Sequence, residues 1–130
     1  MKDLLVVVLF FSFLNLSSQT RPDTISFHKG IFKVRGEILK FPQLLELTKN
    51  NFEAYKEIKK ARADYTATMV FSFIGGFCIG FPLGRALANK QPVWSMLAVG
   101  VGLVGIAIPF NYSFAKHAKK GVRIYNSIVE

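Results

Sequence analysis

The sequence predicts a mainly α membrane protein, an antiparallel two-helix transmembrane hairpin preceded by a short β-hairpin and amphipathic helices. Two uncharged blocks, residues 65–84 and 91–115, carry this prediction. Each block is long enough to cross the ~30 Å hydrocarbon layer of a bilayer as a helix. Seven of the ten glycines lie within the two blocks. With 17 Lys and Arg against 8 Asp and Glu, and one cysteine, the chain is basic and forms no disulfide within itself.

Residues 1–18 have the pattern of a cleavable secretory signal peptide. A polar start precedes an apolar run over residues 4–14, which is too short to span a bilayer and is followed by small and polar residues. We expect cleavage after Ser18, which would make Gln19 the first residue of the mature chain. The alternative is an uncleaved signal anchor, because Leu16 is bulky where a small residue is preferred.

The first structured part after the signal is expected to be a β-hairpin over about residues 25–39. Two-residue alternation predicts a strand with Phe32, Val34 and Ile38 on one side and charged residues on the other. A turn at Lys29-Gly30 would fold this strand back on the residues before it. Such a hairpin is marginal alone, so the following helices, the membrane surface or a partner must cover its apolar face.

Residues 19–64 form a basic extramembrane segment, and its second half is expected to hold two helices, at about 42–49 and 51–64. Pro42 suits a first helical turn, and Asn51 is a plausible N-cap for the second helix. One apolar stripe runs along that second helix, and its charged residues are expected to form a solvated face. The stripe consists of Ala54, Ile58, Ala61 and Tyr65.

Two membrane spans follow, predicted at residues 65–84 and 92–115. The connecting loop, residues 85–91, is short and polar, so the two helices must run antiparallel. Pro92 starts the second span well, and Trp94 suits the membrane interface beside it. A buried helical pair in a soluble protein is excluded, because too few residues remain to cover two helices that are apolar on every face.

Small residues recur at every third or fourth position within both blocks and predict close helix packing. In lipid, helices associate through such seams because the backbones can approach each other. The seams would either close the hairpin itself or mediate oligomerisation; a conducting pore is disfavoured because neither block contains an ionisable residue. The predicted packing residues are Thr68, Ser72, Gly76, Gly80, Gly84, Ser95, Ala98, Gly102 and Gly105.

Basic residues flank the spans on the side of both chain ends, including the basic tail, residues 116–130. They either form solvated faces and anchor the spans at the lipid headgroups, or they bind anionic lipid or an acidic partner. The candidate headgroup or partner residues are Lys56, Lys59, Lys60, Arg62, Lys116, Lys119, Lys120 and Arg123.

No catalytic, metal or cofactor site is expected. The glycines of residues 100–105 match a dinucleotide-binding fingerprint, but the βαβ unit and acidic residue that the fingerprint requires are missing. His28 and His117 lie far apart in sequence and have no Cys or carboxylate at ligand spacing. Cys78 falls in the middle of a span, where a thiol acts as a small apolar residue. Nucleic acid is not expected as a partner.

The layout of the chain combines a leader ending near Gln19, Ile74-Gly75-Gly76 and Gly80-Phe81-Pro82-Leu83-Gly84 in one span, Trp94 at the start of the next, and Tyr125-Asn126 in the tail. In this layout the sequence resembles small exported two-span membrane proteins of Bacteroidota, a group of unassigned function. The resemblance implies no activity. The glycine spacing is also similar to that of glycine-zipper two-span envelope domains, from which the sequence departs by its many phenylalanines and by Pro82 and Pro109.

These features together predict a non-enzymatic envelope protein that acts through helix packing and protein contacts. Its expected partners are membrane lipids and either further copies of the chain or an envelope protein. The signal favours export, to the inner membrane first and the outer membrane as an alternative. Export conflicts with the tendency of Lys and Arg to stay in the cytoplasm, because the basic flanks would then lie outside. The alternatives are a glycine-seam oligomer that forms a small pore or perturbs the membrane, and a basic surface that binds anionic lipid.

Overall fold

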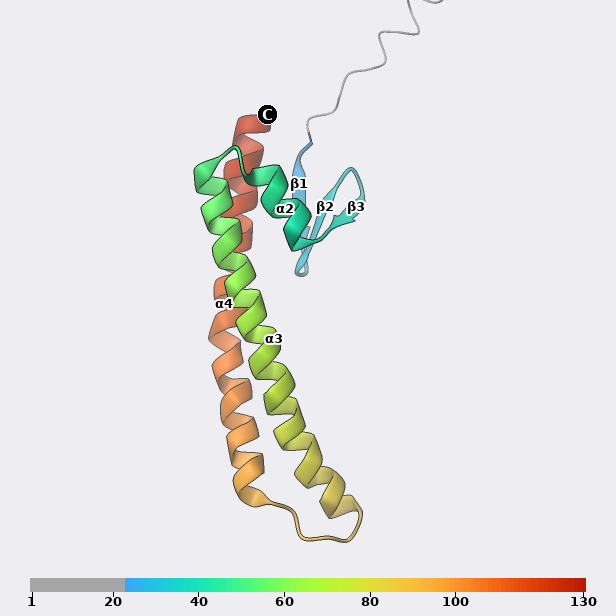
Figure 1. The fold of residues 1–130 in the computed structure, drawn as a ribbon. Coiled ribbons are helices and arrows are strands. Elements are labelled where there is room, and N and C mark those ends of the chain that lie inside the picture. The colour runs from blue at the N-terminus through green and yellow to red at the C-terminus, as the bar shows by residue number, and fades with distance from the viewer. Residues whose placement is uncertain (1–22) are drawn as a thin grey trace, which may run out of the picture.

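A computed structural model describes residues 23–130 of the chain. The predicted signal peptide, residues 1–18, lies outside the described residues. The elements follow in the order β1 (Ile25–His28), β2 (Ile31–Val34), β3 (Glu37–Leu39), α2 (Phe41–Thr48), α3 (Phe52–Leu87) and α4 (Trp94–Val129). The predicted class is confirmed at this level: the chain is mainly helical, with a small antiparallel sheet and two long apolar helices that run antiparallel (Figure 1).

The sheet is a three-stranded antiparallel meander in the order β1-β2-β3. Both of its turns contain two residues with positive φ, Lys29-Gly30 at +50° and +81° and Arg35-Gly36 at +52° and +85°. Two consecutive residues of this kind form the hairpin turns whose twist matches that of the strands. The turn predicted at Lys29-Gly30 is therefore present, and a second turn of the same kind follows it.

That second turn corrects the sequence interpretation, which treated the alternating residues as one strand. Because Arg35 and Gly36 reverse the chain, β3 returns along β2 and pairs Ile38 with Lys33. Ile38 therefore shares the outer face with Lys33 and is 64% exposed, whereas Phe32 is 3% exposed in the core. Within residues 31–38, the predicted alternation of buried and exposed side chains therefore holds along β2 but does not continue through the turn into β3.

Local sequence signals determine where the helices begin. Pro42 lies in the first turn of α2, where its missing N–H costs no hydrogen bond. Asn51 caps α3, because its side chain accepts a hydrogen bond from the backbone N–H of Ala54 at 3.1 Å. The buried hydroxyl of Thr48 near the end of α2 donates to the carbonyl oxygen of Leu44 at 2.9 Å.

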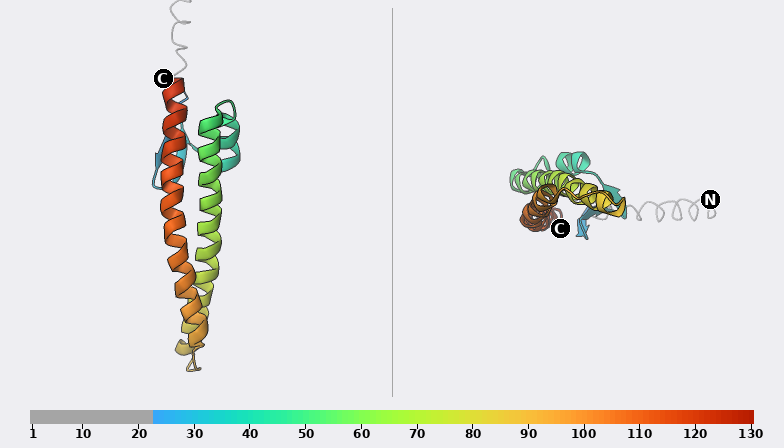
Figure 2. Two further views of the ribbon diagram at one scale, coloured as in Figure 1. Left: turned by 90° about the vertical axis from the view of Figure 1, so that its left-hand side faces the viewer. Right: turned by 90° about the horizontal axis from the view of Figure 1, so that it is seen from below.

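The two long helices each have 36 residues and no interruption. The predicted helix at 51–64 and span at 65–84 are parts of α3, and the predicted second span and basic tail are parts of α4. At 1.5 Å per residue, each helix is about 54 Å long, against ~30 Å for the hydrocarbon layer of a bilayer. The excess length lies at the end that carries the sheet and α2 (Figures 1 and 2).

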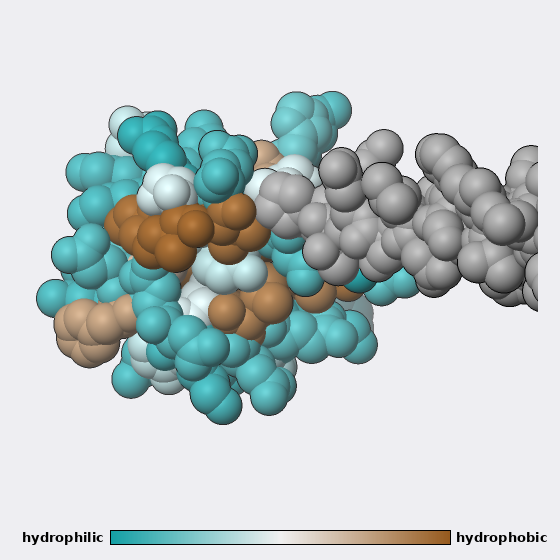
Figure 3. Space-filling model, turned by 90° about the horizontal axis from the view of Figure 1, so that it is seen from above, coloured by the Kyte–Doolittle hydropathy of each residue, from teal (hydrophilic) through white to brown (hydrophobic). Residues whose placement is uncertain are grey.

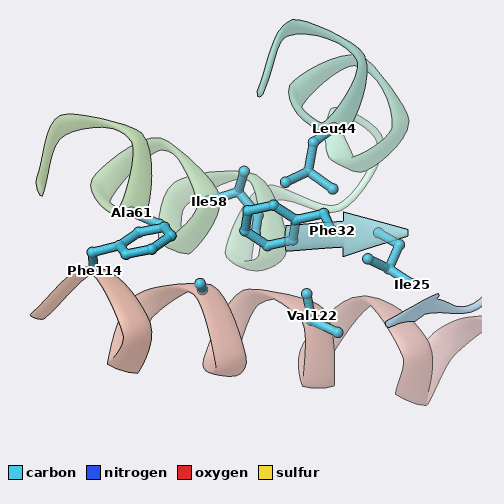
Figure 4. Close-up of a cluster of buried hydrophobic side chains, with 8 residues drawn as sticks. Ile25, Phe32, Leu44, Ile58, Ala61, Phe114 and Val122 are labelled. Atoms are coloured by element: carbon cyan, nitrogen blue, oxygen red, sulfur yellow. The ribbon is translucent and has the colours of Figure 1, made fainter. Parts of the chain in front are cut away.

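We call this end the head; it consists of the sheet, α2, residues 52–64 of α3 and residues 114–129 of α4. Its core is a cluster of side chains from all these elements (Figure 4). Aromatic rings extend the cluster, with Phe114 lying 5.4 Å from Tyr65 and 5.8 Å from Phe27 between ring centroids. The buried members are Ile25, Phe32, Leu44, Ile58, Ala61, Phe114, Ala118 and Val122.

The rest of α3 and α4, residues 65–87 and 94–113, forms what we call the apolar hairpin. Both helices are long and apolar enough to cross a membrane, by length and composition. Only 11% of the most apolar stretch of α3 and 17% of that of α4 is buried within the protein. Large side chains such as Phe73, at 80% exposed, and Leu87, at 89%, project from it. The head end is different, since hydrophilic residues cover most of the face seen in Figure 3.

Candidate functional site

A polar cluster joins α3 to α4 inside the head, and Glu57 is at its centre. The Glu57 side chain is only 8% exposed. Its Oε2 lies 2.6 Å from Nδ1 of His117, and its Oε1 accepts a hydrogen bond from the Nζ of Lys120 at 3.3 Å. Lys60, one turn along α3, places its Nζ 3.8 Å from the same Oε1. The buried carboxylate is therefore surrounded by basic groups from both helices.

The cluster continues toward the apolar hairpin through Asp64. The Nε2 of His117 lies 4.0 Å from Oδ2 of Asp64, and the hydroxyl of Ser113 donates to that oxygen at 2.7 Å. His117 thus lies between two carboxylates of α3. Through Ser113 the cluster reaches the head end of the apolar hairpin.

Two opposing influences determine the pKa of Glu57. Burial raises the pKa, but hydrogen bonds from His117 and Lys120 and the charges of Lys120 and Lys60 outweigh burial and lower it below its ordinary value. Glu57 is therefore ionised at neutral pH. The cluster satisfies this buried charge and fixes the register of α3 against α4, because the partners reach it only in one alignment.

The contacts of the cluster join α3 to α4. Ser113 donates its hydroxyl hydrogen to the Asp64 carboxylate and not to His117, so this hydrogen bond links the two helices as those of Glu57 do. Within residues 23–130, no group of three or more His, Cys, Asp and Glu side chains has the arrangement of a metal site.

A second connection, between Asn126 and β1, holds the sheet on α4. The backbone N–H of Ile25 donates to Oδ1 of Asn126 at 2.8 Å, and Nδ2 of Asn126 donates to the carbonyl oxygen of Ile25 at 2.8 Å. The amide therefore completes both hydrogen bonds of a strand residue that is 2% exposed. This explains how the outer edge of β1 is attached to the head.

Sequence reasoning missed the polar cluster, although a signal for it was present. Glu57 was predicted on a solvated face, but the residue is 6% exposed. Glu57 and Asp64 are seven residues apart beside the apolar stripe of α3, and Ser113, His117 and Lys120 recur at four and three on α4. Polar residues at that spacing, next to an apolar stripe, indicate a buried polar seam between two helices.

The close packing of the apolar hairpin uses Gly75 and Gly100, neither of which was among the predicted packing residues. A methyl group added at Gly100 would lie 2.8 Å from the Gly75 carbonyl oxygen and 2.9 Å from Cβ of Cys78. One added at Gly75 would lie 2.9 Å from Cγ2 of Val104. The two helices touch at backbone distance here, which only glycine permits.

The glycines of the two predicted small-residue seams, which we call the glycine ribbons, instead face away from the neighbouring helix. Apart from its chain neighbours and the backbone of its own helix turn, a methyl group added at any of their five glycines would meet no heavy atom of the described residues within 4 Å. The interpretation that these glycines close the hairpin is therefore wrong for the described chain; the other interpretation, packing against a further molecule, stays a prediction. Ser72, Ser95 and Ala98 are exposed as well, and Thr68 is half-buried. The five glycines are Gly76, Gly80, Gly84, Gly102 and Gly105.

All eight predicted headgroup or partner residues are exposed at the head end of the helices, and they form two groups. On α4, the basic residues border a shallow pocket of about 370 Å³ together with Tyr112 and Ala115. On α3, Lys59 and Arg62 line a groove of about 690 Å³ below α2, whereas Lys60 faces Glu57. The α4 group consists of Lys116, Lys119, Lys120 and Arg123.

No protein-family model matches the chain, and no curated protein or solved structure shows significant similarity to it.

Proposed function

We propose that this chain is a non-enzymatic integral membrane protein of the cell envelope, anchored by the apolar hairpin and acting through the contacts that its basic head makes. One observation carries the proposal: the most apolar stretches of α3 and α4 are 11% and 17% buried. Two helices that are apolar on every face need a covering, and lipid supplies it without further protein.

The two ends of the hairpin support the same assignment. Trp94, at the start of α4, is 71% exposed, as is typical of a side chain at a membrane–water interface. At the other end, the basic residues of both helices begin where the apolar stretch stops, at Arg62 and Lys116. Bands of this kind anchor a helix at the headgroups on either side of the hydrocarbon layer.

The head is built to present a fixed surface. The polar cluster joins both long helices, and the Asn126 contact holds the sheet on α4. Leu44 places α2 in the shared core, and the charged residues on the outside of the head are predominantly basic. A rigid, positively charged head beside a membrane suits recognition of anionic lipid or of an acidic protein surface. Location in the envelope rests on the predicted signal at residues 1–18.

Alkaline carbonate extraction and topology mapping test this proposal. An integral protein stays in the membrane pellet at high pH, whereas a peripheral one is released. A reporter fused after Glu130 should be active only on the exported side. Release by carbonate would overturn the membrane assignment, and an inside reporter would overturn the exported orientation while leaving the hairpin intact.

Self-association in the membrane is the second candidate function, and the open glycine ribbons favour it. A methyl group added at Gly76, Gly80 or Gly84 would meet no other helix of the described residues within 4 Å, so a helix of a second copy could approach the backbone there. Such an oligomer could perturb the membrane or form a small pore. A Gly80→Leu variant should then reduce the oligomer size in detergent. An unchanged size would dispose of this candidate.

A further inference from the structure

We propose that the groove below α2 binds one anionic phospholipid, with the headgroup phosphate at Lys59 and Arg62 and an acyl chain along Ala67, Val70 and Phe71. The inference rests on the membrane assignment above and adds to it a defined site and ligand. The groove has a volume of about 690 Å³, which lies within the ~300–1,000 Å³ of typical ligand pockets.

The groove has a charged end and an apolar end. Its floor is one face of α3, from Tyr55 to Phe71, and Leu45 of α2 borders it in the head. Lys59 and Arg62 lie at the head end, whereas the opposite end contains only small or apolar side chains. The change from one to the other occurs near residue 65, where the first uncharged block begins. A phospholipid has the same sequence of parts, a phosphate followed by hydrocarbon.

The charges favour an anionic ligand over a zwitterionic one. Lys59 and Arg62 are three residues apart on one helix face, so both reach the same region. The described residues that line the groove include no carboxylate, and neither cation has an ion-pair partner within residues 23–130. Guanidinium and ammonium groups both bind phosphate oxygens, and the guanidinium can do so with two parallel hydrogen bonds.

The dimensions agree with an acyl chain. Arg62 and Phe71 are separated by nine residues, or about 14 Å along the helix axis. This is close to the ~15 Å depth of one hydrocarbon leaflet, half of the ~30 Å layer. The lower lining residues are thus at the depth of lipid tails when the cations are at the headgroups. Val70 is 48% exposed and available for this contact.

Binding of phosphatidylglycerol to the full chain in detergent, measured by native mass spectrometry, tests the proposal. The charge variant combines Lys59→Gln with Arg62→Gln, and its matched control combines Lys33→Gln with Lys49→Gln, two exposed lysines outside the groove. Each basic residue near an anionic lipid surface strengthens binding about fivefold, so the charge variant should bind about 30-fold more weakly. The control should bind like the unaltered chain.

A steric variant keeps the charge and checks the apolar end. Ala67→Phe fills the groove and should weaken binding, whereas Val101→Phe adds similar bulk at an exposed site of α4 and should not. Near-UV circular dichroism of each variant confirms that the head is folded. Phosphatidylcholine should bind more weakly than phosphatidylglycerol, and soluble glycerol phosphate should not bind.

Three outcomes would overturn the inference: equal weakening in the charge variant and its control, no preference for the anionic lipid, or tight binding of glycerol phosphate alone. The first outcome would mean that the net positive charge of the chain, and not a defined site, binds the lipid. The last would mean that the groove is an anion site with no place for the acyl chain. Carbonate extraction separates the two proposals. Release from the membrane defeats both, whereas retention with no selective binding defeats only the lipid site.

Discussion

Truncation of Ile58 should strongly destabilise the head. Its side chain is 0% exposed in the core, where α4 passes directly against it at Gly121. Ile58→Ala removes three carbon atoms, about 2.4 kcal/mol at ~0.8 kcal/mol per buried methylene. The helix backbone on the other side cannot close the space, so a cavity term is added. We expect a loss of about 3–4 kcal/mol in the free energy of unfolding, within the usual ~2–5 kcal/mol.

Ile38→Ala is the matched control, because it removes the same atoms from a side chain that is 64% exposed. Its expected cost is below about 0.5 kcal/mol. Denaturant unfolding of the full chain in detergent, followed by near-UV circular dichroism of the aromatic cluster, gives both free energies. Equal losses at Ile58 and Ile38 would refute the packing described for the head and the register of β3.

A compensating substitution sharpens the same prediction. A methyl group added at Gly121 would lie 2.7 Å from Cδ1 and 2.9 Å from Cγ1 of Ile58. Gly121→Ala alone should therefore cost about 1–3 kcal/mol through overpacking. In the Ile58→Ala background both clashing atoms are absent, so the same substitution should stabilise the head. The same sign in both backgrounds would show that the two positions do not touch.

Three further predictions concern the polar cluster, the sheet attachment and the apolar hairpin. In the folded protein the pKa of Glu57 lies below its ordinary value of 4.5. The ionised Glu57 side chain therefore stabilises the fold fully above that pH, and this stabilisation is lost as the pH falls through the folded-state pKa. Glu57→Gln should flatten the acid side of a plot of unfolding free energy against pH. Asn126→Ala leaves two groups of Ile25 without partners and should cost about 1–3 kcal/mol, with faster exchange of the Ile25 amide hydrogen. Gly100→Ala should lower the free energy of unfolding of the hairpin, measured by titration with sodium dodecyl sulfate, by about 1–3 kcal/mol more than Gly102→Ala does. Only the methyl group at Gly100 clashes with the neighbouring helix.

Each of these outcomes can fail independently. An unchanged acid side of the plot in the Glu57 variant would mean that another carboxylate governs acid unfolding. Unaltered exchange of the Ile25 amide would mean that solvent or another group replaces Asn126. Equal effects of the two glycine variants would contradict the backbone contact between α3 and α4 at Gly75.

The fold class was accessible from the sequence because it depends on block composition, whereas the details of the sheet depend on single residues. Uncharged blocks of 20 residues or more predict long apolar helices whatever their exact packing. The β2–β3 turn depends on one Arg35-Gly36 pair that breaks an otherwise regular alternation. Alternation gives a two-residue period but no strand ends, so Ile38 was assigned to the wrong face.

The site was harder to predict because burial is a property of the assembled head. Glu57 lies among lysines in the sequence. Glu57 is buried while those lysines are exposed only because α4 packs across it. His117 was isolated by sequence distance, 60 residues from the carboxylate that it contacts. The prediction that the glycine ribbons close the hairpin was wrong for a related reason. Recurrence at every third or fourth position places residues on one helix face but does not say which molecule that face contacts.

In the membrane arrangement proposed above, the uninterrupted course of α3 and α4 from the head into the apolar hairpin fixes the depth of the groove in the bilayer. Arg62 and Lys116 stand at the boundary, and a charged side chain at the bilayer centre costs ~2.5–3.5 kcal/mol, so neither helix can sink freely. Trp94 at the far end opposes movement in the other direction. Because the helices are locked in register by Glu57 and His117, a shift of one requires a shift of both. That arrangement would hold the cations of the groove at headgroup level and its apolar end at the level of the acyl chains.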